Sequence, residues 1–136
     1  MRAAIVGTGF IARVHEGVLR SLGVEIVAVA GRTRESAAAF DAAPAYDDVE
    51  ALLDAERPDV LHVCTPNDAH ARSALAALAR GVHVVCEKPL AVSSEECEAL
   101  VGAAEERNLV NAVCYHVRGY PLVEHMRAAL TQVGSL

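Results

Sequence analysis

The fold is decided by residues 2–12, which read RAAIVGTGFIA. A mostly apolar run of strand length leads directly into a glycine-rich loop, and apolar residues then recur at helical spacing as far as Leu22. The loop matches the pattern Gly-x-Gly-x-x-Gly/Ala, in which the first glycine permits a tight turn and the second lets the backbone approach a pyrophosphate. Because the loop opens a helix, the free N–H groups of that helix would face the anion. The stretch therefore predicts a dinucleotide-binding βαβ unit, with a plain structural turn as the alternative.

Apolar runs of strand length alternate with segments of helical period along the rest of the chain, as in βαβ units around a parallel sheet. We therefore predict an α/β fold of the Rossmann type, a doubly wound parallel sheet whose ligand site lies at the carboxyl ends of the strands. Besides Arg2–Val6, strands are expected over Glu25–Ala30, Val60–Cys64, Val82–Cys86 and Leu109–Tyr115, with a short connection through Tyr46. Helices are expected from Ile11 to Leu22 with Gly23 as the C-terminal cap, over Arg34–Ala43, from a cap at Asp48 through Glu56, over Ala69–Arg80, from a cap at Ser93 or Ser94 to Arg107, and from Pro121 through Leu130.

Composition and charge restrict the classes of function. The chain has 136 residues, with 12 Lys and Arg against 18 Asp and Glu, so its formal net charge is −6. Nucleic acid is not expected as a partner, because phosphate binding needs a basic surface. The length and a hydrophobic content of 53% predict a single domain over residues 1–136.

The sequence also bears on the cellular compartment. No apolar run approaches the roughly 20 residues that span a bilayer, and Met1 leads straight into a strand rather than into a cleavable signal. We therefore expect no membrane contact and a cytoplasmic location. The cysteines show no CxxC spacing, so we expect buried, reduced thiols at Cys64, Cys86, Cys97 and Cys114.

The end of the second predicted strand bears on the choice of dinucleotide. A carboxylate at this place accepts hydrogen bonds from the ribose hydroxyls of NAD, but the sequence has Gly31-Arg32-Thr33 there. Without a carboxylate nothing repels a 2′-phosphate, and the forked donors of Arg32 can bind one with help from Thr33 and Arg34. NADP is therefore favoured, with NAD as the second choice. The alternative for Arg32 is a solvated loop arginine.

Several other groups of residues are not expected to have a catalytic or binding role. Outside the motifs discussed next, no second histidine or carboxylate stands at metal-ligand spacing, so no metal site is predicted. The acidic run at Glu95, Glu96 and Glu98 is expected to be a solvated helix face. The histidines expected to be structural or exposed are His15, His62, His83, His116 and His125, and the apolar residues of the final helix expected in the core are Leu122, Val123, Met126 and Leu130.

Three further motifs follow the glycine loop at predicted strand ends. They are CTPNDAH over residues 64–70, GVHVVCEKPL over 81–90 and YHVRGYP over 115–121. Together with GTGFIA over residues 7–12, they closely resemble the Gfo/Idh/MocA family of NAD(P)-dependent oxidoreductases. The resemblance covers essentially the whole chain, and its most specific element is the tripeptide EKP after a buried strand.

The resemblance implies a role for residues in each motif. Glu87 would bond a ribose hydroxyl. Lys88 would be the catalytic residue between cofactor and substrate, where an ammonium stabilises developing alkoxide charge and helps to move the carbinol proton. A partly buried lysine can also have its pKa lowered into a useful range. Pro89 would hold the loop, with a cis peptide bond as a candidate.

The implied contacts with the cofactor extend over the other motifs. Gly7 and Gly9, with the backbone of Phe10 and Ile11, correspond to the pyrophosphate loop. A histidine in the first turn of a helix can also simply cap it or face solvent, which is the alternative for His70. The residues implied around the nicotinamide ribose are Thr65, Pro66, Asn67 and His70, and Arg118 resembles an arginine near the nicotinamide end.

Members of this family carry a second, larger αβ domain that forms the substrate pocket and commonly the oligomer interface. The sequence ends at residues 134–136, about where that domain would begin, so we expect the C-terminal domain to be absent and the helix after about residue 120 to lead toward it. The oligomeric state stays open. The expected function is that of the NAD(P)-binding domain of an oxidoreductase acting on a sugar, cyclitol or related polyol, with poor turnover by this chain alone.

Two other functions are weighed against this one. A non-catalytic nucleotide-binding or interaction module derived from the family is the main alternative, although it would have no need of Lys88 and Arg118. A methyltransferase using the same glycine loop for S-adenosylmethionine is disfavoured, because that cofactor also tends to need an acidic residue after the second strand.

Overall fold

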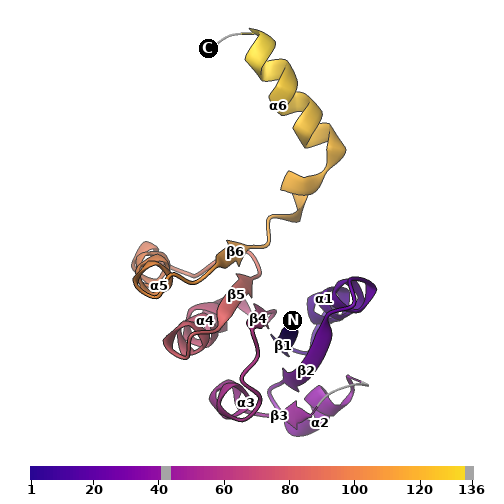
Figure 1. Cartoon of the computed structure of the whole chain (residues 1–136), viewed down its shortest axis with the longest axis vertical. Coiled ribbons are helices and arrows are strands. Elements are labelled where there is room, and N and C mark those ends of the chain that lie inside the picture. The colour runs from indigo at the N-terminus through magenta and orange to yellow at the C-terminus, as the bar shows by residue number, and fades with distance from the viewer. Residues whose placement is uncertain (41–43, 134–136) are drawn as a thin grey trace.

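A six-stranded parallel sheet forms the centre of the molecule (Figure 1). The computed structural model describes residues 1–40 and 44–133, with side chains up to residue 130. The strand order is β3-β2-β1-β4-β5-β6, so the chain starts in the middle of the sheet and builds outward in both directions. This order confirms the predicted doubly wound fold of the Rossmann type. The strands are β1 (Arg2–Val6), β2 (Glu25–Ala30), β3 (Ala45–Tyr46), β4 (Val60–Val63), β5 (His83–Cys86) and β6 (Asn111–Val113).

Helices cover both faces of the sheet. On one face, α1 (Phe10–Ser21) and α2 (Arg34–Ala38) pack apolar side chains against β1 and β2. On the other face lie α3 (Val49–Glu56), α4 (His70–Ala79) and α5 (Ser94–Glu106), over the larger of the two apolar clusters (Figure 1). These clusters consist mainly of Val, Leu, Ile and Ala, whose burial supplies most of the stability of such a fold.

Local capping signals set the beginnings and ends of several helices. The Asp48 carboxylate accepts a hydrogen bond from the backbone N–H of Ala51 at 2.8 Å, and the Ser93 hydroxyl accepts one from Glu96 at 3.2 Å. Both predicted caps are confirmed, with Ser93 rather than Ser94 in the second case. Gly23 follows α1 with a φ of +68°, the left-handed conformation typical of a residue just after a helix.

The second helix is shorter than the sequence indicates. α2 ends at Ala38, and the guanidinium of Arg13 from α1 then binds the backbone carbonyl of Ala39 at 2.7 Å. The same guanidinium lies 3.6 Å from the centre of the Phe40 ring, which is buried beneath it. This contact satisfies a carbonyl that a longer helix would have used. The remainder of the predicted helix, residues 41–43, lies outside the described residues.

Two strands also differ from the prediction. The connection through Tyr46 contains β3, which pairs with the end of β2. At the opposite edge, β6 covers only the middle of the predicted strand Leu109–Tyr115. An edge strand has one neighbour, and β6 pairs only with the three residues of β5 from Val84 to Cys86.

The final helix, α6 (Pro121–Val133), projects away from the sheet (Figure 1). It begins at Pro121, as expected of a proline at the first helical position. The prediction that its apolar side belongs to the core is wrong, because Leu122, Met126 and Leu130 are all more than half exposed. An amphipathic pattern shows that a helix has an apolar side but not what covers that side. No helix within the described residues is long and apolar enough to cross a membrane.

Candidate functional site

The candidate site lies where the order of the strands reverses, between β1 and β4. The connections that follow these two strands lead to opposite faces of the sheet, so a crevice opens between them at the carboxyl ends. The glycine loop follows β1, the segment beginning at Thr65 follows β4, and Glu87 with Lys88 follows β5. The fold therefore brings these three sequence motifs to one edge.

Gly7 makes the turn at the end of β1. Its φ is +108°, and a Cβ atom at this position would overlap the backbone carbonyl oxygen of Cys64. The N–H of Gly7 donates to the carbonyl of Ala30 at 2.8 Å, which ties the loop to the end of β2. The first glycine of the motif is therefore required by the protein's own backbone.

Gly9 has different surroundings. It precedes α1 with an extended backbone, and a Cβ atom there would meet no protein atom within 4 Å. The first turn of α1 has no acidic residue and no side-chain cap, so side chains leave its N–H groups, those of Phe10 and Ile11 included, free. Free N–H groups and the partial positive charge of a helix N-terminus favour an anion. No packing among the described residues requires glycine at position 9, but a phosphate close to the backbone would.

An open hollow of about 380 Å³ lies beside this end of α1. The hydroxyl oxygen of Thr65 is buried without a hydrogen-bond partner in the part of the chain that the structure describes. Buried polar atoms rarely lack a partner, so this hydroxyl suits a polar group of a ligand. The hollow is lined by Phe10, Ile11, Thr65, Asn67, His70, Glu87, Lys88 and His116.

Glu87 is a buried carboxylate that receives hydrogen bonds from His15, from the backbone of Lys88 and from the Cys114 thiol. Its Oε1 atom lies 3.2 Å from Nε2 of His15, and its Oε2 atom accepts a hydrogen bond from the backbone N–H of Lys88 at 3.1 Å. Burial by itself would raise the pKa of Glu87, but the hydrogen bonds from His15, Lys88 and Cys114 together outweigh it and lower the pKa. The group is ionised at neutral pH and keeps lone pairs for a further donor.

His15 links this carboxylate to a second histidine. Its Nδ1 atom lies 2.9 Å from Nδ1 of His62 on β4, with the two rings edge to face. Burial, together with the neighbouring His15, lowers the pKa of His62 to about 4, so its imidazole is neutral at neutral pH. His15 thus connects α1 with β4 and with the end of β5.

Lys88 borders the hollow with its side chain exposed, so the partial burial considered from the sequence is not seen. Its ammonium has no hydrogen bond or ion pair within residues 1–40 and 44–130. The peptide bond between Lys88 and Pro89 is cis, as anticipated. A cation without a protein partner at the rim of the hollow is free to contact a bound molecule.

His70 is the first residue of α4 and is 1% exposed, so it neither faces solvent nor acts as a cap. One ring nitrogen lies 2.7 Å from the carbonyl oxygen of Pro89, and the other lies 2.9 Å from that of Thr65. A neutral ring could donate to only one of these carbonyls, whereas an imidazolium donates to both. His70 therefore joins the two loops that border the hollow, and its ring nitrogens are already used.

The remaining predicted cofactor residues lie outside this hollow. Pro66 is exposed at the end of β4, and Arg118 is exposed on the 3₁₀ helix His116–Gly119. Arg32 is exposed after β2, with no ion pair in the described parts of the chain. The Thr33 hydroxyl accepts a hydrogen bond from the backbone N–H of Ser36, caps α2 and also bonds the side chain of Glu35.

Sequence reasoning missed four residues at this site. His15, His62, Cys114 and His116 were expected to be structural, buried or exposed, yet the three histidines and the Cys114 thiol line a groove beside Glu87. Cys64 and Cys86 are buried as predicted, whereas Cys97 and Cys114 are half-buried, and all four thiols are free. The missed residues come from three different elements and from the connection after β6, so only the strand order could have brought them together.

Comparison with known proteins identifies the group to which this architecture belongs. The sequence profile of an oxidoreductase family with an NAD-binding Rossmann fold, Gfo/Idh/MocA, matches residues 1–115. The chain belongs to the Gfo/Idh/MocA family. Members of this family are oxidoreductases, and the matching part is their NAD-binding region.

Individual Gfo/Idh/MocA proteins show how far the similarity extends. UDP-N-acetylglucosamine 3-dehydrogenase of Acidithiobacillus ferrooxidans is 33% identical over 132 residues, which cover 95% of this chain and 41% of that protein. The WlbA dehydrogenase of Bordetella pertussis, solved with NADH and UDP-GlcNAcA, superposes with a TM-score of 0.89 at 28% identity, over 97% of this chain and 42% of the other. Biliverdin reductase of Synechocystis, solved with biliverdin and NADP⁺, superposes with a TM-score of 0.83 at 27% identity, over 98% and 44%. The chain thus spans about two fifths of the length of these relatives.

Proposed function

We propose that this chain binds a nicotinamide dinucleotide, with NADP(H) preferred to NAD(H), and contributes Lys88 to the oxidation or reduction of a sugar, cyclitol or related polyol. The observation that carries the proposal is the hollow beside α1. There the free helix N-terminus, the unpartnered hydroxyl of Thr65, the carboxylate of Glu87 and the unpaired ammonium of Lys88 border one space. Family membership supplies the reaction class, because members of the family are oxidoreductases.

The residues present fit a dinucleotide along the length of the crevice. The open space at Gly9 and the free N–H groups of α1 would receive the pyrophosphate. The ionised Glu87 would accept a hydrogen bond from a ribose hydroxyl, and the Thr65 hydroxyl would gain the partner that it lacks. At the other end, Arg32 follows β2 where a carboxylate would otherwise bind the ribose of NAD, and its unpaired guanidinium suits a 2′-phosphate.

The dinucleotide, when bound, supplies the nicotinamide ring, which exchanges a hydride with the substrate. Lys88 is the protein group suited to the accompanying proton. Its ammonium would donate a hydrogen bond to the substrate oxygen, stabilise negative charge that develops there, and transfer a proton to or from that oxygen. Because the hollow is open to solvent, we expect slow turnover by this chain alone.

The substrate class rests on relatives rather than on the site. The similar protein from Acidithiobacillus ferrooxidans is a dehydrogenase of a sugar nucleotide, and the Bordetella enzyme was solved with one. Such substrates offer secondary hydroxyl groups, which match the proton transfer proposed for Lys88. Biliverdin reductase shows that a similar fold also acts on a different class of molecule, so the substrate needs its own experiment.

The test is calorimetric titration of the chain with NADPH and with NADH, followed by a screen for turnover on a panel of polyols. We expect NADPH to bind more tightly than NADH. Gly9→Val should abolish binding of both while the circular dichroism spectrum stays unchanged, because the added side chain fills only the open space where the pyrophosphate would lie. The matched control is Gly17→Val, an equally unobstructed glycine farther along α1, which should bind as the wild type does.

The outcomes separate the two functions considered. Absence of binding, or full binding by Gly9→Val, would overturn the dinucleotide site. Tight binding without turnover on any substrate, in whatever active form of the enzyme carries this chain with Lys88 intact, would favour a non-catalytic nucleotide-binding module.

A further inference from the structure

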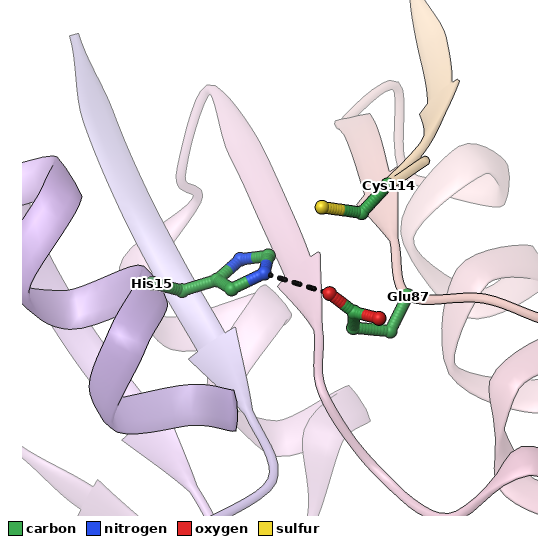
Figure 2. A group of neighbouring side chains, drawn as sticks. All are labelled: His15, Glu87 and Cys114. Carbon is green, nitrogen blue, oxygen red and sulfur yellow. Dashed lines mark hydrogen bonds and ion pairs between the residues drawn. The ribbon is translucent and has the colours of Figure 1, made fainter. Parts of the chain in front are cut away.

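Three potential metal ligands meet beside the hollow. Nε2 of His15, a carboxylate oxygen of Glu87 and the sulfur of Cys114 all lie within 4.8 Å of one another. They come from α1, from the residue after β5 and from the residue after β6, and Figure 2 shows the three side chains pointing toward a common space. The side chains of His15 and Glu87 are buried and Cys114 is half-buried, so this is not a chance group of solvated surface residues.

The donor atoms favour one class of ion. Imidazole nitrogen, thiolate sulfur and carboxylate oxygen are the ligands of zinc in proteins, at about 2.0–2.3 Å from the ion. A thiolate selects against magnesium and calcium, which prefer oxygen ligands. With the thiol deprotonated, the thiolate and the Glu87 carboxylate carry two negative charges, which balance a divalent ion. The ligand atoms lie within 4.8 Å of one another, and bonds of that length would require Cys114 to approach the other two ligands on binding.

Neighbouring groups already orient two of the three ligands. With Nε2 of His15 facing the ion, its Nδ1–H would donate to Nδ1 of His62, 2.9 Å away. The backbone N–H of Lys88 holds the second oxygen of Glu87 at 3.1 Å. Histidine ligands of zinc almost always donate their other N–H to a carboxylate, a backbone carbonyl or water, and His62 would take that acceptor role here; the loss of such a partner weakens metal binding by about 10–100-fold.

An approach path reaches the cluster. A largely apolar groove of about 570 Å³ runs between α1 and the exposed part of the sheet, and His15, Glu87 and Cys114 contribute to its lining. An ion could enter by this groove, and water could complete its coordination, as in zinc sites with three protein ligands.

From these observations we infer that His15, Glu87 and Cys114 form a binding site for one zinc-class divalent ion, with His62 as the group that orients His15. Because Glu87 is also the proposed partner of a ribose hydroxyl, metal binding is measured without any dinucleotide, so that its failure is separate from failure of the proposed function.

The probe is Co²⁺, added to the reduced chain and followed by absorption. We expect one equivalent of Co²⁺ to bind. The spectrum should show a near-ultraviolet thiolate-to-cobalt charge-transfer band and the visible bands typical of Co²⁺ with a low coordination number. Zn²⁺ added afterwards should abolish the bands, since it binds such sites more tightly than Co²⁺. Cys114→Ser, a nearly isosteric change, should lose the charge-transfer band, whereas Cys97→Ser, at the half-buried cysteine of α5, should keep it.

Two histidine variants complete the test. His15→Gln should weaken Co²⁺ binding by about tenfold or more, and His62→Gln by about tenfold, while His125→Gln, on the exposed side of α6, should change nothing. Circular dichroism checks that each variant is folded. If His15→Gln is unfolded, the charge-transfer band of Cys114→Ser alone tests the metal site. Absence of a charge-transfer band in the wild type, or its persistence in Cys114→Ser, would overturn the site.

Discussion

The Nε2 atom of His15 lies 3.2 Å from the Oε1 atom of Glu87, although the two residues are 72 positions apart in the chain. Both side chains are buried, with 9% and 7% of their surface exposed. A buried carboxylate needs donors, and Glu87 has them from His15, from the backbone of Lys88 and from the Cys114 thiol. The contact between His15 on α1 and Glu87 at the end of β5 therefore helps to keep Glu87 ionised and fixed at the edge of the hollow.

A double-mutant cycle measures this contact. His15→Leu, Glu87→Gln and the double variant are unfolded in urea, with a chelator present to exclude metal ions. We expect a coupling free energy of about 1.5–3 kcal/mol, the range for a hydrogen bond to a charged group. If the changes in the free energy of unfolding caused by the two single substitutions add up to that of the double variant, the two side chains do not interact directly.

Arg32→Ala should distinguish the two dinucleotides. If the guanidinium binds a 2′-phosphate, its loss removes charge-assisted hydrogen bonds from NADPH and none from NADH. We expect the dissociation constant for NADPH to rise by about tenfold or more and that for NADH to change by less than about twofold, measured by calorimetry. Arg72→Ala, an exposed arginine of α4, is the control. Equal effects on both dinucleotides would remove Arg32 from the phosphate site.

The sequence was sufficient where a structure is determined locally. The caps at Asp48 and Ser93 and the apolar strand that begins at Val60 each depend on neighbouring residues, and the structure has all of them. The Rossmann topology followed from the same alternation of elements.

The side-chain contacts at the site could not be predicted, because they depend on which elements become neighbours in space. His15 and Cys114 approach Glu87 only once α1, β5 and β6 are in position, and no spacing along the chain indicates this. His70 is expected near the nicotinamide ribose from the resemblance alone, and its two carbonyl partners belong to loops whose course the sequence does not give. The exposed side of α6, with Leu122 and Leu130, shows that a helical pattern does not specify a partner.

Gly7→Ala should destabilise the fold rather than affect binding selectively. The added Cβ would overlap the carbonyl of Cys64, and the φ of +108° is unfavourable for alanine. Strain of this kind combined with overpacking costs about 2–5 kcal/mol. Urea unfolding should show this loss, while Gly17→Ala in the exposed part of α1 should leave stability unchanged or raise it. A Gly7→Ala variant as stable as the wild type would show that the loop can relax away from β4.

Lys88→Ala should separate catalysis from binding. The ammonium has no partner in residues 1–40 and 44–130, so its removal should leave folding intact and change the dissociation constant for the dinucleotide by less than about threefold. Turnover on a polyol substrate, in whatever active form of the enzyme carries this chain, should fall by about 10²-fold or more, as expected for loss of a general acid–base group. Arg72→Ala serves again as the control, because it removes one positive charge away from the site. An unchanged turnover number would exclude Lys88 from the chemistry.

Cys64 should resist alkylation in the folded chain. Burial, followed by the nearby Glu87 carboxylate, raises the pKa of this thiol to about 12. The thiolate is the reactive form, so at pH 8 only about one molecule in 10⁴ would carry it, and each rise of one pH unit below the pKa should increase that fraction about tenfold. Iodoacetamide treatment at pH 8 followed by peptide mass spectrometry should therefore label the half-buried Cys97 and leave Cys64 unmodified, whereas both should react in urea. Labelling of Cys64 in the native chain as fast as Cys97 would mean that the end of β4, against which Gly7 packs, opens readily to solvent.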